Sequence, residues 1–218
     1  MTFTKIYTSF LIAFLSLACS CNNNEKGDSE NRLKHTNSKH QHHFVDRKKN
    51  AYVEALNSGK IQIDTMKSSP LRMVKKTIGK TTITISYSSP GVKGRVIWDG
   101  LVPYGNVWVS GAHEATKVRL SNDIKIEGLI LPAGKYAIFT IPGEKKWTVI
   151  LNKNYRQHLT DEYDPKDDVA RFDVVPVKIE RDMPRLTYQI TQTSSKGGTI
   201  SLKWEKIQIT LPFVLSDV

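Results

Sequence analysis

The residues best suited to chemistry lie in one stretch, residues 94–116, which reads GRVIWDGLVPYGNVWVSGAHEAT. Its glycines allow tight turns or a close approach to a ligand, and its aromatic side chains supply rigid apolar walls with polar tips. Glu114 and His113 place a carboxylate next to an imidazole, a combination that suits general acid–base catalysis. We therefore expect Glu114 and His113 to be the catalytic candidates of this chain.

Three further side chains of the stretch are expected to bind a ligand. Arg95 is suited to placing an anion, while Tyr104 and Trp108 offer aromatic walls. Adjacent residues of a regular strand point to opposite faces, so His113 and Glu114 can share a pocket with them only if the chain bulges there. The alternative is structural, with Arg95 and Glu114 forming an ion pair and the tryptophans belonging to the core.

Motifs for specific chemistry are incomplete. His113-Glu114 begins like the zinc motif HExxH, but Lys117 stands where the second histidine is required. No G-x-S-x-G elbow is present, and the acidic stretch from Asp161 to Asp168 lacks the spacing of an EF-hand. His158 and Asp161 could pair across one turn. We expect no metal and no cofactor.

The elements that must position these residues are mostly strands. Apolar and polar residues alternate with period two in short runs separated by Gly and Pro. Such runs occur at residues 82–87, 117–120, 124–127, 136–141, 147–151, 173–177, 186–190, 199–204 and 207–211. About ten short strands without a long helical period predict an all-β antiparallel sandwich or jelly-roll-like barrel over residues 61–218.

The first 20 residues have the features of a bacterial lipoprotein signal peptide. An apolar run of 13 residues, Ile6 to Ala18, is shorter than the ~20 needed to span a bilayer. Both cysteines of the chain, Cys19 and Cys21, follow it. We expect acylation at Cys21, with Cys19 as the alternative, and hence a membrane-anchored envelope lipoprotein that faces the periplasm or the exterior and has the lipid bilayer as a partner.

Residues 21–60 are predicted to form a polar, His-rich, disordered tether with a short helix near its end, in residues 44–57. The chain has a formal net charge of +11. In an exported protein this charge favours an anionic glycan or small-molecule ligand or a lipid surface, and no nucleic-acid-binding motif is present.

Three segments of the sequence resemble a known family. The segments SPGVKGRVIWDGLVPYGNVWVSGAHEAT, LPAGKYAIFTIPGEKKWTVILNK and YDPKDDVARFDV are similar to the domain-of-unknown-function family 2911, a group of secreted proteins and lipoproteins. The resemblance covers roughly residues 70–213 and implies an all-β domain in the cell envelope without an established activity. Val109, Ser110 and His113 replace the family's Arg, Thr and Asn, so a ligand held by those residues would differ here.

Two classes of function follow from these observations. The first is a non-catalytic binding or scaffolding module for a glycan, lipid or protein ligand. The second is a carbohydrate-active hydrolase or lyase that uses Glu114 as general acid or base. The two differ in one geometric requirement, because an enzyme needs Arg95, Tyr104, His113 and Glu114 to converge in one pocket.

Overall fold

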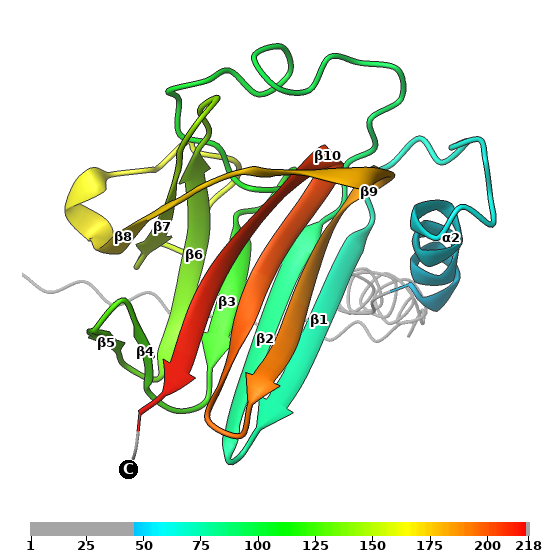
Figure 1. Ribbon diagram of the computed structural model, residues 1–218. Coiled ribbons are helices and arrows are strands. Elements are labelled where there is room, and N and C mark those ends of the chain that lie inside the picture. The colour runs from blue at the N-terminus through cyan, green and yellow to red at the C-terminus, as the bar shows by residue number, and fades with distance from the viewer. Residues whose placement is uncertain (1–45, 217–218) are drawn as a thin grey trace, which may run out of the picture. The chain divides into compact units, whose positions relative to one another are not determined.

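The computed structural model describes residues 46–216, and its strands form two antiparallel sheets (Figure 1). The six-stranded sheet has the order β1-β2-β3-β6-β7-β8, and the four-stranded sheet has the order β5-β4-β10-β9. The expected all-β sandwich is therefore confirmed. The elements are α2 (Arg47–Asn57), β1 (Leu71–Ile78), β2 (Thr81–Ser88), β3 (Thr116–Leu120), β4 (Ile124–Ile126), β5 (Leu129–Leu131), β6 (Gly134–Ile141), β7 (Trp147–Asn152), the 3-10 turn η2 (Pro165–Asp167), β8 (Asp168–Val174), β9 (Val177–Ser194) and β10 (Gly197–Leu215).

The core lies between the sheets because each strand turns its alternate apolar residues to the same side. On β2 the buried residues are Ile83, Ile85 and Tyr87, and the threonines between them are partly exposed. On β9 the buried residues Leu186 and Tyr188 belong to the same cluster. The period-two pattern of the sequence thus corresponds to the inner faces of the two sheets.

Strand β10 doubles back on itself. The Ser201 hydroxyl lies 3.1 Å from that of Thr210, although nine residues of extended strand would span about 30 Å. The Leu215 amide donates to the Lys196 carbonyl at 2.8 Å, near the start of the strand. Glu205, at the turn, has φ +53°, and Figure 1 shows the two limbs side by side. The expected runs 199–204 and 207–211 are these two limbs.

Strand β9 changes direction before it joins β10. Besides a shift at Gly197–Gly198, its pairing shifts register from Lys203–Thr187 to Glu205–Met183 and then to Ile207–Lys178. The first part of β9 therefore crosses one end of the sandwich, and the second part runs along β10 (Figure 1). This crossing leaves the segment from Lys178 to Met183 at the surface above the end of the sheets.

All four tryptophans of the chain meet at that end. Trp98 lies 4.8 Å from Trp147 and 5.7 Å from Trp204 between ring centroids, and Trp108 stacks on Trp204 at 5.7 Å. The indole N–H groups of Trp98 and Trp204 have no hydrogen-bond partner among the described residues. The rings therefore close the end of the core mainly through apolar contact and edge-to-face geometry.

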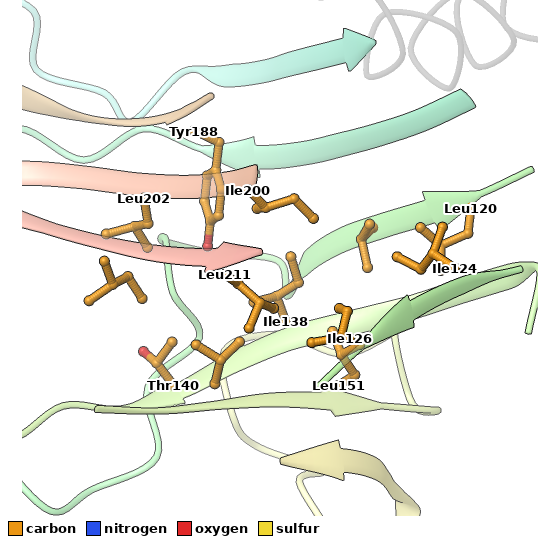
Figure 2. Close-up of a pocket in the computed structure, with 13 residues that line it drawn as sticks. Leu120, Ile124, Ile126, Ile138, Thr140, Leu151, Tyr188, Ile200, Leu202 and Leu211 are labelled. Atoms are coloured by element: carbon orange, nitrogen blue, oxygen red, sulfur yellow. The ribbon is translucent and has the colours of Figure 1, made fainter. Parts of the chain in front are cut away.

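A small cavity of about 30 Å³ remains between the sheets, and Figure 2 shows side chains from both sheets around it. Its walls are aliphatic except for Tyr188 and Thr140. The Tyr188 hydroxyl donates to the Ser110 carbonyl at 3.1 Å, and Thr140 accepts a hydrogen bond from the Ser110 hydroxyl at 3.0 Å. A cavity of this size holds one or two water-sized groups and is too small for an acyl chain.

The expected short helix is confirmed as α2. The Asp46 carboxylate caps its first turn and accepts hydrogen bonds from the amides of Lys48 at 3.0 Å and Lys49 at 3.2 Å. These hydrogen bonds lower the pKa of Asp46. Val53 and Leu56 are fully buried, so the helix docks on the domain through a narrow apolar stripe.

Candidate functional site

Arg95 is exposed and serves its own loop. Its guanidinium donates to the carbonyls of Val92, at 3.2 Å from Nε, and of Gly91. Gly94 has φ +69° and Lys93 has φ +50°, so the chain turns sharply there. The arginine thus stabilises the turn of residues 91–95.

Tyr104 lies beside the tryptophan end of the molecule. Partial burial raises the pKa of its hydroxyl, and the nearby carboxylates of Glu144, Asp99 and Glu205 raise it further. The phenol therefore stays protonated in an acidic neighbourhood. Trp108 is part of the tryptophan cluster described above and contributes mainly to packing.

His113 and Glu114 lie in an irregular segment, as the expectation of a bulge requires. Ser110 and His113 have φ +55° and +61°. The segment pairs with the loop of residues 153–163, because the Leu159 amide donates to the His113 carbonyl at 2.6 Å and Glu114 forms an isolated bridge with His158. These contacts place the two segments side by side on the outer face of the six-stranded sheet.

The side-chain contacts of Glu114 are electrostatic and exposed. Its carboxylate is 3.9 Å from the Lys117 ammonium, and its side chain is 61% exposed. Across the bridge, the His158 ring lies 3.1 Å from the Asp161 carboxylate, so the pair considered from the sequence does form. Glu114 therefore has His158 as its neighbour across the ladder.

The contacts of the five expected site residues fall into two groups. Arg95 contacts carbonyls of its own turn, whereas Glu114 contacts Lys117, and the two form no ion pair with each other. Arg95, Tyr104 and Trp108 belong to the loop at the tryptophan end, and His113 and Glu114 belong to the ladder with residues 157–159. The catalytic role of Glu114 and His113 stays a prediction.

Loop 153–163 is held by a polar network that the sequence did not single out. The Tyr163 hydroxyl donates to Asp168 at 2.9 Å, and Arg171 pairs with the same carboxylate at 2.7 Å. Burial and the Asp168 carboxylate raise the pKa of Tyr163 to about 12. The buried Asn152 amide also donates to Asp168, at 2.8 Å.

A second unexpected cluster surrounds Arg185, whose side chain is completely buried. Its Nε lies 2.9 Å from the Asp64 carboxylate, and its other nitrogens donate to carbonyls of Met66, Ser68 and Ser89. In the alternation of β9 this position is opposite to Leu186, which predicts exposure. Its burial depends on residues 61–68, which cover it.

Two grooves flank the same segment. Groove A has a volume of about 570 Å³ and lies between α2 and β9; it is lined by Glu54, Asn57, Ser58, Val74, Ile179, Arg181, Met183, Thr187, Tyr188, Gln189, Ile190 and Lys203. Groove B has a volume of about 470 Å³ and is lined by Gln62, Ile63, Asp64, Val92, Lys93, Gly94, Asp182, Met183, Pro184, Glu205 and Lys206. Met183 of β9 borders both grooves.

Within residues 46–216, no helix has the length and hydropathy to cross a bilayer. In the same part of the chain, no three His, Asp or Glu side chains are grouped so as to hold a metal ion. The proposed acylation sites Cys19 and Cys21 and the histidine-rich part of the tether lie outside the described residues.

Fold and site together define an all-β sandwich with surface grooves along one edge strand. The chain belongs to the family of proteins of unknown function DUF2911, whose model matches residues 69–213. No curated protein and no solved structure matches the chain. The matched region includes β1 to β10 almost entirely and excludes α2 and residues 61–68.

Proposed function

We propose that this protein is a non-catalytic binding module of the bacterial cell envelope and that its ligand is a protein. The observation that carries the proposal is the pair of grooves of about 570 and 470 Å³ along β9. Their volumes fall within the range of about 300–1,000 Å³ that is usual for ligand-binding clefts.

The chemistry of groove A favours a protein over the other two ligand classes. Apolar Val74, Ile179 and Met183 lie beside charges of both signs, Glu54 and Arg181. Such mixed surfaces, with Met and Arg, are typical of protein interfaces. A glycan platform needs open aromatic faces, but the tryptophans pack on one another. A lipid needs a larger apolar cavity than the one of about 30 Å³ between the sheets.

The enzyme alternative receives less support. Glu114, the candidate general acid or base, is 61% exposed and pairs with Lys117. Neither groove is lined by Glu114 or His113. General acid–base catalysis on a glycosidic bond requires two groups held at a defined separation in a site that binds the sugar.

Site-specific photo-crosslinking in the native envelope tests the proposal. A photoreactive residue at Gln189 in groove A or at Asp182 in groove B is expected to give one discrete protein adduct. The same residue at the exposed Glu127, on the β4–β5 turn, serves as the control. After identification of the adduct partner, Gln189→Arg should weaken its binding at least tenfold. Equal adducts from Glu127, or none from the groove positions, contradict the proposal.

The envelope location is a separate part of the proposal and rests on the N-terminal sequence. Acylation of Cys21 would anchor the chain to a bilayer, with the polar segment to residue 45 as the connection to the domain. Cys21→Ser should abolish acyl-label incorporation and move the protein to the soluble fraction. If Cys19→Ser alone has that effect, Cys19 is the acylated residue.

A further inference from the structure

Residues 61–68, here called the strap, cover Arg185, and their apolar side chains are at most partly buried. None of these eight residues is classed as buried, and the Ile63 side chain points to solvent at 74% exposure. The strap lies outside the family-matched region, whereas Arg185 lies inside it. A segment outside the family-matched region therefore contacts an arginine inside it.

The strap holds on mainly through Arg185. Its Asp64 carboxylate forms an ion pair with the guanidinium, with Oδ2 2.9 Å from Nε, and Oδ1 accepts a hydrogen bond from Nη2 at 2.9 Å. The Ser68 carbonyl accepts at 2.8 Å, and the Met66 carbonyl accepts as well. The remaining partner of the guanidinium is the Ser89 carbonyl of the domain, at 3.1 Å.

The strap is also attached to α2, through Tyr52 and through the Ile61 amide, which donates to the Ala55 carbonyl at 3.1 Å. The Tyr52 hydroxyl accepts a hydrogen bond from the Thr65 amide at 2.8 Å. The helix has contacts of its own with the domain, because Val53 and Leu56 are buried. In addition, the Asn57 side-chain amide donates to the Arg185 carbonyl at 2.9 Å and accepts from the Arg185 amide at 3.0 Å. The strap can therefore open while α2 remains docked.

Segments with few buried apolar contacts have low local unfolding free energies. If the strap opens, the Arg185 guanidinium keeps the Ser89 carbonyl as a partner and loses Asp64, Met66 and Ser68. A guanidinium in this position binds a carboxylate bidentately. The strap also shows how Arg185 would bind the backbone of a peptide. The Met66 and Ser68 carbonyls, two and four residues after Asp64, accept hydrogen bonds from the guanidinium.

From these contacts we infer that Arg185 is the centre of a binding site for an extended peptide that carries an Asp or Glu side chain, and that the strap occupies this site as an internal ligand. This inference rests on the proposed function, because it names the ligand class and the regulation of the same surface. The external peptide places an Asp or Glu side chain where Asp64 now lies. Opening of the strap removes Gln62, Ile63 and Asp64 from the wall of groove B and leaves their place to the peptide.

Two variants loosen the strap by different physical means. Asp64→Asn removes the charge that pairs with Arg185. Gly91→Ala keeps that charge but introduces a Cβ that would lie 2.6 Å from the Asp64 carboxylate and 3.5 Å from the guanidinium carbon. Asp173→Asn is the matched control, since it removes the same charge from the exposed Lys146–Asp173 pair at 2.8 Å.

Hydrogen exchange on the full chain gives the first readout. In Asp64→Asn and Gly91→Ala, the amides of Thr65 and Met66 should exchange at least tenfold faster, while those of residues 199–203 in β10 keep their wild-type rates. Asp173→Asn should change neither set. Parallel acceleration of the β10 amides in both strap variants would show that the strap is an integral part of the fold, and the inference would be overturned.

Peptide binding gives the second readout. The probe is a labelled synthetic peptide of residues 59–69, GKIQIDTMKSS. It should bind Asp64→Asn at least tenfold more tightly than it binds the wild type, whose own strap competes. A probe with Asn in place of its aspartate should lose this binding. Equal binding to both proteins, or binding to neither, overturns the inference.

The two proposals fail separately. If the peptide binds the Asp64→Asn chain but crosslinks at Gln189 and Asp182 find no partner, Arg185 binds carboxylate-bearing peptides and the proposed envelope partner is wrong. If crosslinks find a partner that binds wild type and Asp64→Asn equally, the proposed function stands and the regulation by the strap is wrong.

Discussion

The strap and loop 153–163 are both irregular segments that lie on the surface of the sandwich, yet they are held by opposite means. The strap is held mainly by polar contacts, to the buried Arg185 and to α2, and its apolar residues are at most partly buried. The loop places Tyr163 against the buried Phe139 ring at 5.2 Å and adds the buried side chain of Gln157. A segment held mainly by contacts to one buried charge can be loosened by one substitution, whereas a segment held by apolar packing together with a polar network is less sensitive to a single change.

The largest expected effect is at the apolar base of the loop. Phe139→Ala removes a fully buried ring from the cluster under the loop, which should lower the free energy of unfolding by about 3–5 kcal/mol. Urea denaturation measures this change. Val175→Ala, at a position that is 70% exposed, is the control and should cost less than about 0.5 kcal/mol. A loss below about 1 kcal/mol in Phe139→Ala would show that packing does not hold the loop.

The stability costs of two glutamine-to-alanine substitutions, one in the loop and one in the strap, can be compared directly. The Gln157 amide donates to the Asn154 carbonyl at 2.7 Å and accepts from the Glu162 amide at 3.3 Å in a buried position. Gln157→Ala leaves those groups unpaired and should cost about 1–3 kcal/mol. Gln62, near the strap's start, donates to the Gly59 carbonyl at 2.7 Å but is exposed, so Gln62→Ala should cost less than about 0.5 kcal/mol. Thermal melts of both variants check the contrast, and equal losses would contradict it.

The pH response of the loop follows from Tyr163. Its pKa is raised from 10.0 to about 12, first by burial and then by Asp168, so the folded state favours the neutral phenol. This contribution to stability is fully present below pH 10 and is lost as the pH rises toward 12. Urea unfolding at a series of pH values should show a shallower decline over this interval in Tyr163→Phe. An unchanged slope would show that Tyr163 does not contribute to the pH dependence of stability.

A small effect is expected at Glu114, the residue that looked most catalytic in the sequence. Its pair with Lys117 is exposed and spans 3.9 Å, so Glu114→Gln should change the free energy of unfolding by less than about 1 kcal/mol. Calorimetry checks this expectation, and Lys117→Gln should give the same result. A much larger loss in Glu114→Gln would indicate a structural role that the exposed pair does not explain.

The sandwich could be predicted because strand periodicity is local. The alternation at residues 82–87 and 186–190 identified buried faces that the structure confirms. Strand β1 was missed, because an edge strand with Lys75 and Lys76 exposed carries little alternation. The bend of β10 at Glu205 joins two runs that the pattern had separated correctly.

The candidate site was less accessible to sequence reasoning. The block of residues 94–116 is contiguous in the chain, but its ends contact different parts of the molecule, the turn at Gly91 and the ladder with His158. Arg185 gave no signal, since its position on β9 predicts an exposed residue. Its burial comes from a segment 117 to 121 residues away in the chain.

The sequence by itself determined the all-β class, the short helix and the inward faces of the strands, because these depend on spacing along a few residues. Only the tertiary structure decided which charges are buried and which are exposed. Asp64 and Glu114 are both acidic side chains of irregular segments, but one neutralises a buried guanidinium and the other meets solvent. That difference arises from contacts between distant segments, which the order of residues along the chain does not specify locally.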